Sequence, residues 1–142
     1  MNLENGRSKC MHILLVEDDT VEAMTVKRAL KELQVTHSLS IAGNGEEALA
    51  YLRDERNTRP GLILLDLNMP KMNGIELLTL IKQDSTLRRI PVIVLTTSKH
   101  EEDKIATFDL SVAGYMVKPV DYPQFVKTMH AINMYWTLSE VS

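Results

Sequence analysis

Polar side chains follow four of the five apolar runs in this chain, at the point where each run ends. The first run is followed by Glu17 and Asp18, the third by Asp66, the fourth by Thr96 and the fifth by Lys118. If these runs are parallel strands of one sheet, their carboxyl ends meet at a single edge. Three carboxylates, a hydroxyl and an ammonium group are therefore candidates for one site.

This combination of groups suits phosphoryl transfer to a carboxylate. Neighbouring carboxylates repel one another, which raises their proton affinity unless a cation neutralises them. Mg²⁺ prefers oxygen ligands and commonly binds one or two carboxylates together with phosphate oxygens. An aspartate can attack phosphorus to form an acyl phosphate, while a metal ion and a lysine stabilise the charge of the transferring group. The residues predict Asp66 as the acceptor, with Thr96 donating a hydrogen bond to a phosphoryl oxygen.

Apolar patterns predict the elements that must position these groups. Continuous apolar runs of strand length are typical of parallel sheets that are covered on both faces, and apolar residues at helical spacing follow each run. Five strand–helix repeats predict an α/β fold with a doubly wound, five-stranded parallel sheet and five helices. The strands are predicted at 12–16, 37–42, 62–65, 91–95 and 113–117, and the later helices at 46–53, 75–83, 99–110 and 121–136.

Length and composition limit the function classes. The chain has 142 residues and a net charge of −3, which fits one globular domain and argues against nucleic-acid binding. Cys10 is the single cysteine, so no internal disulfide forms, and no apolar run suits a membrane span or a secretory signal. We expect a cytoplasmic protein with a flexible tail at 1–10, a domain at 11–138 and a short tail at 139–142.

Four sequence blocks resemble the receiver domain of two-component response regulators, which has a flavodoxin-like fold. They occur in the family's order and at the expected strand ends. The blocks are Leu14 to Asp18, Leu64 to Gly74, Pro91 to Thr96 and Gly114 to Pro119.

The resemblance implies a role for each matching position. Asp66 corresponds to the phospho-acceptor, and Glu17 and Asp18 to the acidic pair that holds Mg²⁺, although many family members have Asp in place of Glu17. Asn68 would offer its backbone carbonyl to the metal. The remaining roles are contacts to the phosphoryl oxygens from Thr96 and Lys118, an aromatic switch at Tyr115, and a cis peptide bond between Lys118 and Pro119.

A narrower resemblance covers the segment from Leu87 to Ser98 and the end of the last helix, Met134 to Trp136. These stretches are similar to the stand-alone regulators of cyanobacterial phytochrome histidine kinases. The resemblance implies a light-sensing histidine kinase as the phosphodonor and a homodimeric regulator. With no attached output domain expected, the signal would leave through an unidentified downstream protein.

The last predicted helix offers a candidate dimer interface. Phe125, Met129, Ile132 and Trp136 recur on one face, and the default interpretation of such a stripe is the core. Apolar surface on the neighbouring face, with Tyr135 and Trp136 beyond the likely sheet edge, indicates a partner surface instead. We therefore name Phe125, Met129, Tyr135 and Trp136 as candidate interface residues.

Two other functions compete with a phosphorylation switch. A phosphohydrolase with an aspartyl-phosphate intermediate usually has a second acid two residues after the nucleophile, where this chain has Asn68. A phosphorylation-independent pseudo-receiver would serve only as an interaction module, and the intact Asp66, Thr96 and Lys118 argue against it. We expect a signalling protein that catalyses only its own phosphorylation and dephosphorylation, and not an enzyme with a metabolic substrate.

Overall fold

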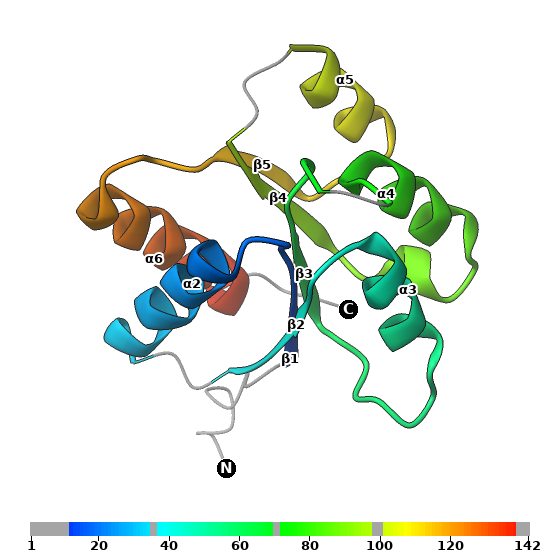
Figure 1. Cartoon of the computed structure of the whole chain (residues 1–142), viewed down its shortest axis with the longest axis horizontal. Helices are drawn as coiled ribbons and strands as arrows, with labels where there is room; N and C mark the ends of the chain where they lie inside the picture. Colours follow the sequence, from blue (N-terminus) through cyan, green and yellow to red (C-terminus); the bar gives the residue numbers. More distant parts are fainter. Residues whose placement is uncertain (1–11, 35–36, 70–71, 98–100, 139–142) are drawn as a thin grey trace.

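The chain alternates strands and helices from one end to the other (Figure 1). The computed structural model describes residues 12–34, 37–69, 72–97 and 101–138, without the side chains of residue 101 and residues 135–138. The predicted tails at 1–10 and 139–142 lie outside the described residues. The elements are β1 (His12–Val16), α2 (Thr20–Glu32), β2 (Ser38–Ala42), α3 (Gly45–Arg53), β3 (Leu62–Leu65), α4 (Gly74–Gln83), the 3₁₀ helix η1 (Leu87–Arg89), β4 (Val92–Thr96), α5 (Glu101–Asp109), β5 (Gly114–Val117) and α6 (Tyr122–Leu138).

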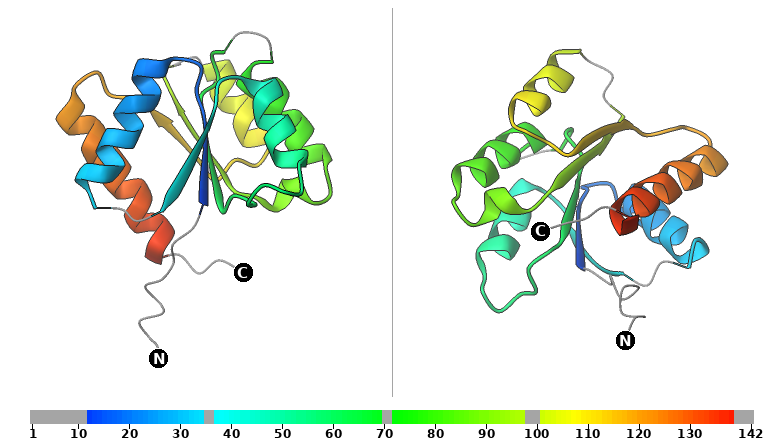
Figure 2. Two further views of the ribbon diagram at one scale, coloured as in Figure 1. Left: turned by 60° about the horizontal axis from the view of Figure 1, so that its bottom comes forward. Right: turned by 180° about the vertical axis from the view of Figure 1, so that it is seen from behind.

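All the paired strands are parallel, and the sheet has the order β2-β1-β3-β4-β5. Helices α2 and α6 cover one face, and α3, α4 and α5 lie on the other (Figures 1 and 2). Alternate residues of β1 serve the two cores, since successive side chains of a strand point to opposite faces. Ile13 and Leu15 pack with α2 and α6, whereas Leu14 and Val16 pack with α3 and α4. The predicted doubly wound fold is confirmed.

Side-chain caps begin four of the described helices, and at α6 the carboxylate of Asp121 accepts a hydrogen bond from the backbone N–H of Gln124. Asp19 accepts hydrogen bonds from the first backbone N–H groups of α2, and Asn44 accepts one from the first turn of α3. Asn73 and Glu76 form a reciprocal capping box at the start of α4. Each cap satisfies backbone donors that have no partner within the helix, so these residues fix where the helices begin relative to the strand ends.

The sheet departs from the sequence expectation at β5. This strand lies at the edge of the sheet and is only half-buried, and 39% of Val117 is exposed. The short helix η1 has no signal in the sequence, because three residues are too few for an apolar periodicity. Asp84 follows α4 and accepts hydrogen bonds from the backbone N–H groups of Thr86 and Leu87 at the start of η1.

Candidate functional site

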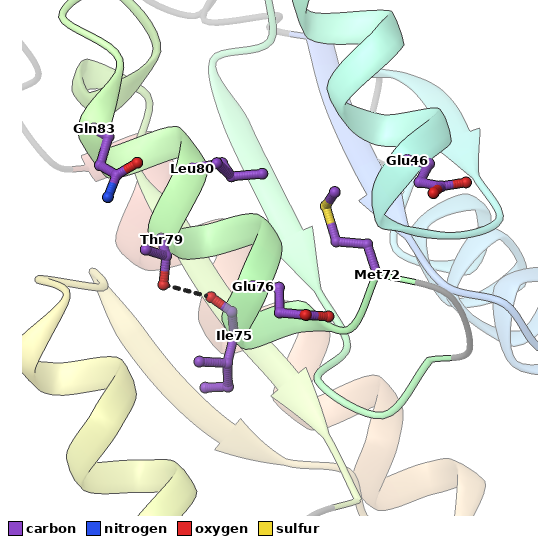
Figure 3. A pocket seen from close by; sticks show the side chains of 7 residues that line it. All are labelled: Glu46, Met72, Ile75, Glu76, Thr79, Leu80 and Gln83. Carbon is purple, nitrogen blue, oxygen red and sulfur yellow. Dashed lines mark hydrogen bonds between the residues drawn. The ribbon is translucent and has the colours of Figure 1, made fainter.

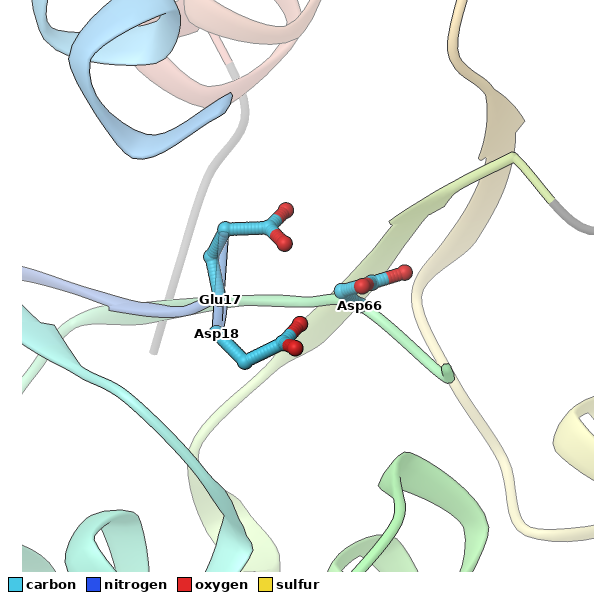
Figure 4. A group of neighbouring side chains, drawn as sticks. All are labelled: Glu17, Asp18 and Asp66. Atoms are coloured by element: carbon cyan, nitrogen blue, oxygen red, sulfur yellow. The ribbon is translucent and has the colours of Figure 1, made fainter. Parts of the chain in front are cut away.

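Three carboxylates gather where β1 and β3 end (Figure 4). Val16 and Leu65 are register partners in the neighbouring strands, so the residues that follow them emerge side by side. One carboxylate oxygen from each of Glu17, Asp18 and Asp66 lies within 4.8 Å of the others. Glu17 and Asp66 are buried, whereas Asp18 is exposed. The strand-end rule therefore correctly predicted this cluster.

Thr96 and Lys118 complete the cluster from β4 and from the residue after β5. The Thr96 hydroxyl donates a hydrogen bond to Asp66 Oδ1 at 2.8 Å. The Lys118 ammonium contacts Glu17 Oε1 at 2.5 Å and Glu22 Oε1 at 3.3 Å, and its backbone N–H donates to the carbonyl oxygen of Thr96. All five predicted strand-end residues thus meet at one edge of the sheet.

Similarity to known proteins accords with this geometry. The sequence model of the response regulator receiver domain matches residues 13–130. The chain belongs to this family. It is 43% identical over 128 residues to the response regulator Rcp1 of Synechocystis sp., and the match covers 87% of each chain. As a receiver domain, it is a signalling protein and not a conventional enzyme.

Two solved structures are similar in both fold and sequence. The Mn²⁺-bound form of Rcp1 superposes with a TM-score of 0.85 at 41% identity, covering 92% of this chain and 96% of that one. The phosphorylated cyanobacterial phytochrome response regulator RcpA superposes with a TM-score of 0.84 at 42% identity, covering 89% and 93%. These matches confirm the predicted resemblance to cyanobacterial phytochrome response regulators.

The receiver site concentrates negative charge beyond what one lysine neutralises. Burial raises the pKa of Glu17 to about 7, the charge of Asp66 adds to this shift, and the hydrogen bond from Lys118 opposes it. Burial alone would lower the pKa of Lys118, but its hydrogen bond to Glu17 and the nearby carboxylate charges outweigh burial, so the pKa rises. Lys118 stays protonated, and the surplus of carboxylates fits a divalent cation with oxygen ligands.

Glu22 is a site residue that the sequence analysis missed. It lies in the first turn of α2, and its carboxylate is the second partner of Lys118. Its position in the sequence does indicate this role. The helix after β1 begins beside the site, so an acidic residue in its first turn lies near the carboxylate cluster. Glu22 is part of the electrostatic balance of the site.

Two details of Lys118 differ from the resemblance. Its ammonium pairs with Glu17, directly after β1, and with Glu22 of α2. The described residues contain no cis peptide bond, so the expected cis bond between Lys118 and Pro119 is trans. The trans form is the lower-energy isomer of an X–Pro bond in the absence of a tertiary constraint.

Asn68 and Tyr115 lie where the sequence placed them, but their roles stay predictions. The backbone N–H of Asn68 donates to Asp66 Oδ1 at 3.4 Å, which holds the loop after β3 near the site. Tyr115 is half-buried on β5, packs against the core between the sheet and α4, and faces the ring of Phe108 at 6.5 Å between centroids.

The candidate interface residues divide into two groups. Phe125 and Met129 are 3% and 1% exposed and pack in the core that α2 and α6 form with the sheet. The core interpretation therefore holds for these two residues, and neither offers surface to a partner. The side chains of Tyr135 and Trp136 lie outside the described residues.

A groove between α3 and α4 is separate from the carboxylate cluster (Figure 3). Its volume is about 540 Å³, and Met72, Ile75 and Leu80 form much of its apolar lining. The groove contains none of the predicted site residues, and its Glu76 side chain is engaged in the cap of α4. Among the described helices, none is both long and apolar enough to cross a membrane.

Proposed function

We propose that Asp66 accepts a phosphoryl group from a phosphohistidine of a sensor kinase, with Mg²⁺ bound by Glu17, Asp18 and Asp66. The observation that supports this most strongly is the meeting of three carboxylates, Thr96 and Lys118 at one sheet edge. In the transfer, an Asp66 carboxylate oxygen forms the new bond to phosphorus as the bond from phosphorus to the histidine nitrogen breaks. When bound, Mg²⁺ would neutralise negative charge on the phosphoryl oxygens.

The chain's own residues have distinct parts in this proposal. The Thr96 hydroxyl already donates to Asp66, so it is within reach of oxygens attached there. The Lys118 ammonium is held beside the cluster by two carboxylates, and it supplies the positive charge that a phosphoryl group needs. The backbone carbonyl of Asn68 would be a further oxygen ligand for the cation.

The test is incubation of the protein with acetyl phosphate and Mg²⁺, followed by intact mass measurement. We expect the mass gain of one phosphoryl group, its loss in Asp66→Asn, and its retention in Asp109→Asn, which replaces an exposed carboxylate at the end of α5. No gain in the unaltered protein would favour a phosphorylation-independent interaction module instead.

We infer that the phosphodonor is a phytochrome-type, light-sensing histidine kinase. Support comes from similarity to RcpA, which is described as a phytochrome response regulator, at 42% identity. Kinases encoded near this protein's gene, phosphorylated in advance, should transfer to Asp66 faster than an unrelated kinase does. Equal rates for the neighbouring and the unrelated kinases would contradict the inference.

We further propose that the protein forms a homodimer through α6. Met134 on this helix is 43% exposed, and Val126 is half-buried beside the core. Sedimentation should show a dimer at tens of micromolar, and Met134→Lys should shift it toward monomer. A monomer with and without a phosphate mimic would exclude this assembly.

A further inference from the structure

A hollow lined by arginines lies at the end of the sheet opposite Asp66. Its volume is about 470 Å³, and it is formed by the turn before β3 and the segment between α4 and β4. Strand β3 separates this end from the carboxylate cluster, since the turn precedes Leu62 and Asp66 follows Leu65. The lining residues are Arg59, Ser85, Thr86, Arg88 and Arg89.

None of the three guanidinium groups forms a close ion pair: among the described residues, no carboxylate lies within salt-bridge distance of Arg59, Arg88 or Arg89. The side chain of Arg59 is held by a 3.0 Å hydrogen bond to the carbonyl oxygen of Thr86, which fixes it at the rim. Arg88 and Arg89 thus add two positive charges to that of Arg59 in one hollow.

The nearby acid is Asp84, at the end of α4. Asp84 does not line the hollow, and its Oδ1 accepts hydrogen bonds from the backbone N–H groups of Thr86 and Leu87 at 2.8 and 3.0 Å. These backbone hydrogen bonds lower the pKa of Asp84, and the charges of Arg53 and Arg59 add to the shift. Asp84 thus partly compensates the charge of Arg59, whereas in the described part of the chain no ion pair joins it to Arg88 or Arg89. The exposed hydroxyls of Ser85 and Thr86 add hydrogen-bond donors beside the arginines.

The chemistry of the lining defines the ligand. Guanidinium groups present planar forks of donors that match phosphate oxygens in two-point contacts. Three guanidinium groups supply more donor forks and more positive charge than one phosphate needs. A linked pair or triple of phosphates matches this charge and this donor count.

We propose that Arg59, Arg88 and Arg89 form a binding site for a small di- or triphosphate, remote from Asp66. Binding there is independent of the phosphoryl chemistry proposed above. The carboxylate cluster repels such an anion when no metal is present. Binding measured in the presence of a chelator therefore reports on the arginine site alone.

The test is calorimetric titration of the full chain with pyrophosphate at low ionic strength in excess EDTA. We expect one site per chain and an affinity that falls by about tenfold or more in the exposed double variant Arg88→Gln, Arg89→Gln, because two charge-assisted contacts are lost. Asp66→Asn should bind as the unaltered protein does.

Arg56→Gln is the matched control. Arg56 lies in the same turn as Arg59, but its guanidinium is paired with Asp54 at 2.9 Å. Its replacement should leave the affinity within about twofold. Absence of binding, an equal loss in the control, or no loss in the double variant would overturn the proposal. Tighter binding of a glutamate-rich peptide than of pyrophosphate would also overturn it, in favour of an acidic protein partner.

Discussion

Burial of Glu17 favours its protonated form, whereas its proposed role as a metal ligand needs the charged form. Its carboxylate is 4% exposed, and its pKa of about 7 in the fold exceeds the ordinary value of 4.5. The folded state therefore holds this proton more tightly than the unfolded state does. The resulting stability is fully present below pH 4.5 and is lost as the pH rises through 7.

Replacement of Glu17 should change how stability depends on pH. Without divalent cations, we expect the free energy of unfolding to fall between pH 4.5 and 7 by an amount on the order of 1–3 kcal/mol that Glu17→Gln removes. Denaturant unfolding at several pH values measures this difference. Glu55→Gln, at an exposed position, should keep the slope of the unaltered protein. Parallel curves for the unaltered protein and Glu17→Gln would contradict the prediction.

Thr96 tests whether a single hydrogen-bond donor at Asp66 matters for phosphorylation. Thr96→Ala removes the hydroxyl that donates to Asp66 Oδ1, and the rate with acetyl phosphate should fall by roughly 10²-fold. Thr96→Ser keeps the hydroxyl and should recover most of the rate. A time course of the mass gain measures both variants, and similar rates in the two would show that the hydroxyl does not contribute.

At the scale of elements, Gly74 joins the start of α4 to the backbone of the site. A Cβ there would lie 2.6 Å from the Asp66 carbonyl oxygen and 2.6 Å from Leu67 Cα, and neither backbone atom can move without shifting the loop. Gly74→Ala should cost about 1–3 kcal/mol of stability and slow phosphorylation of Asp66. Thermal unfolding and the mass assay measure these two effects.

Gly114→Ala provides the control for Gly74. A Cβ at Gly114 would meet its nearest neighbour, Ile93, at 3.8 Å, an ordinary contact. We expect a smaller loss of stability and an unchanged rate of phosphorylation. If both alanine variants behave alike, close packing of α4 against the loop after β3 does not position Asp66.

The sequence predicted most elements because each carries a local physical signal. The apolar run from Leu62 to Leu65 fits a strand that is buried on both faces, and apolar residues at helical spacing indicate α4. The carboxylate cluster followed from parallel topology alone. The pairing of Lys118 with Glu22 could not be predicted, because it depends on side-chain positions between elements that are distant in sequence.

At the scale of the whole molecule, divalent cations should stabilise the fold. A cation that binds the folded site and not the unfolded chain raises the melting temperature by mass action, and we expect this of Mg²⁺. Carboxylates must be deprotonated to bind it, so the rise should be larger at pH 8 than at pH 5. Asp18→Asn should reduce the rise in melting temperature, since it removes one of the three carboxylates of the cluster. An equal rise at both pH values would contradict binding at this site.

The most direct test of Asp66 as the acceptor is chemical mapping of the phosphorylated residue. Borohydride reduces an aspartyl phosphate to homoserine, and peptide mass mapping then locates the altered residue. After treatment with acetyl phosphate and Mg²⁺, we predict homoserine at position 66 and at no other aspartate. Reduction at Asp18 instead, or an unaltered peptide map, would contradict phosphoryl transfer to Asp66.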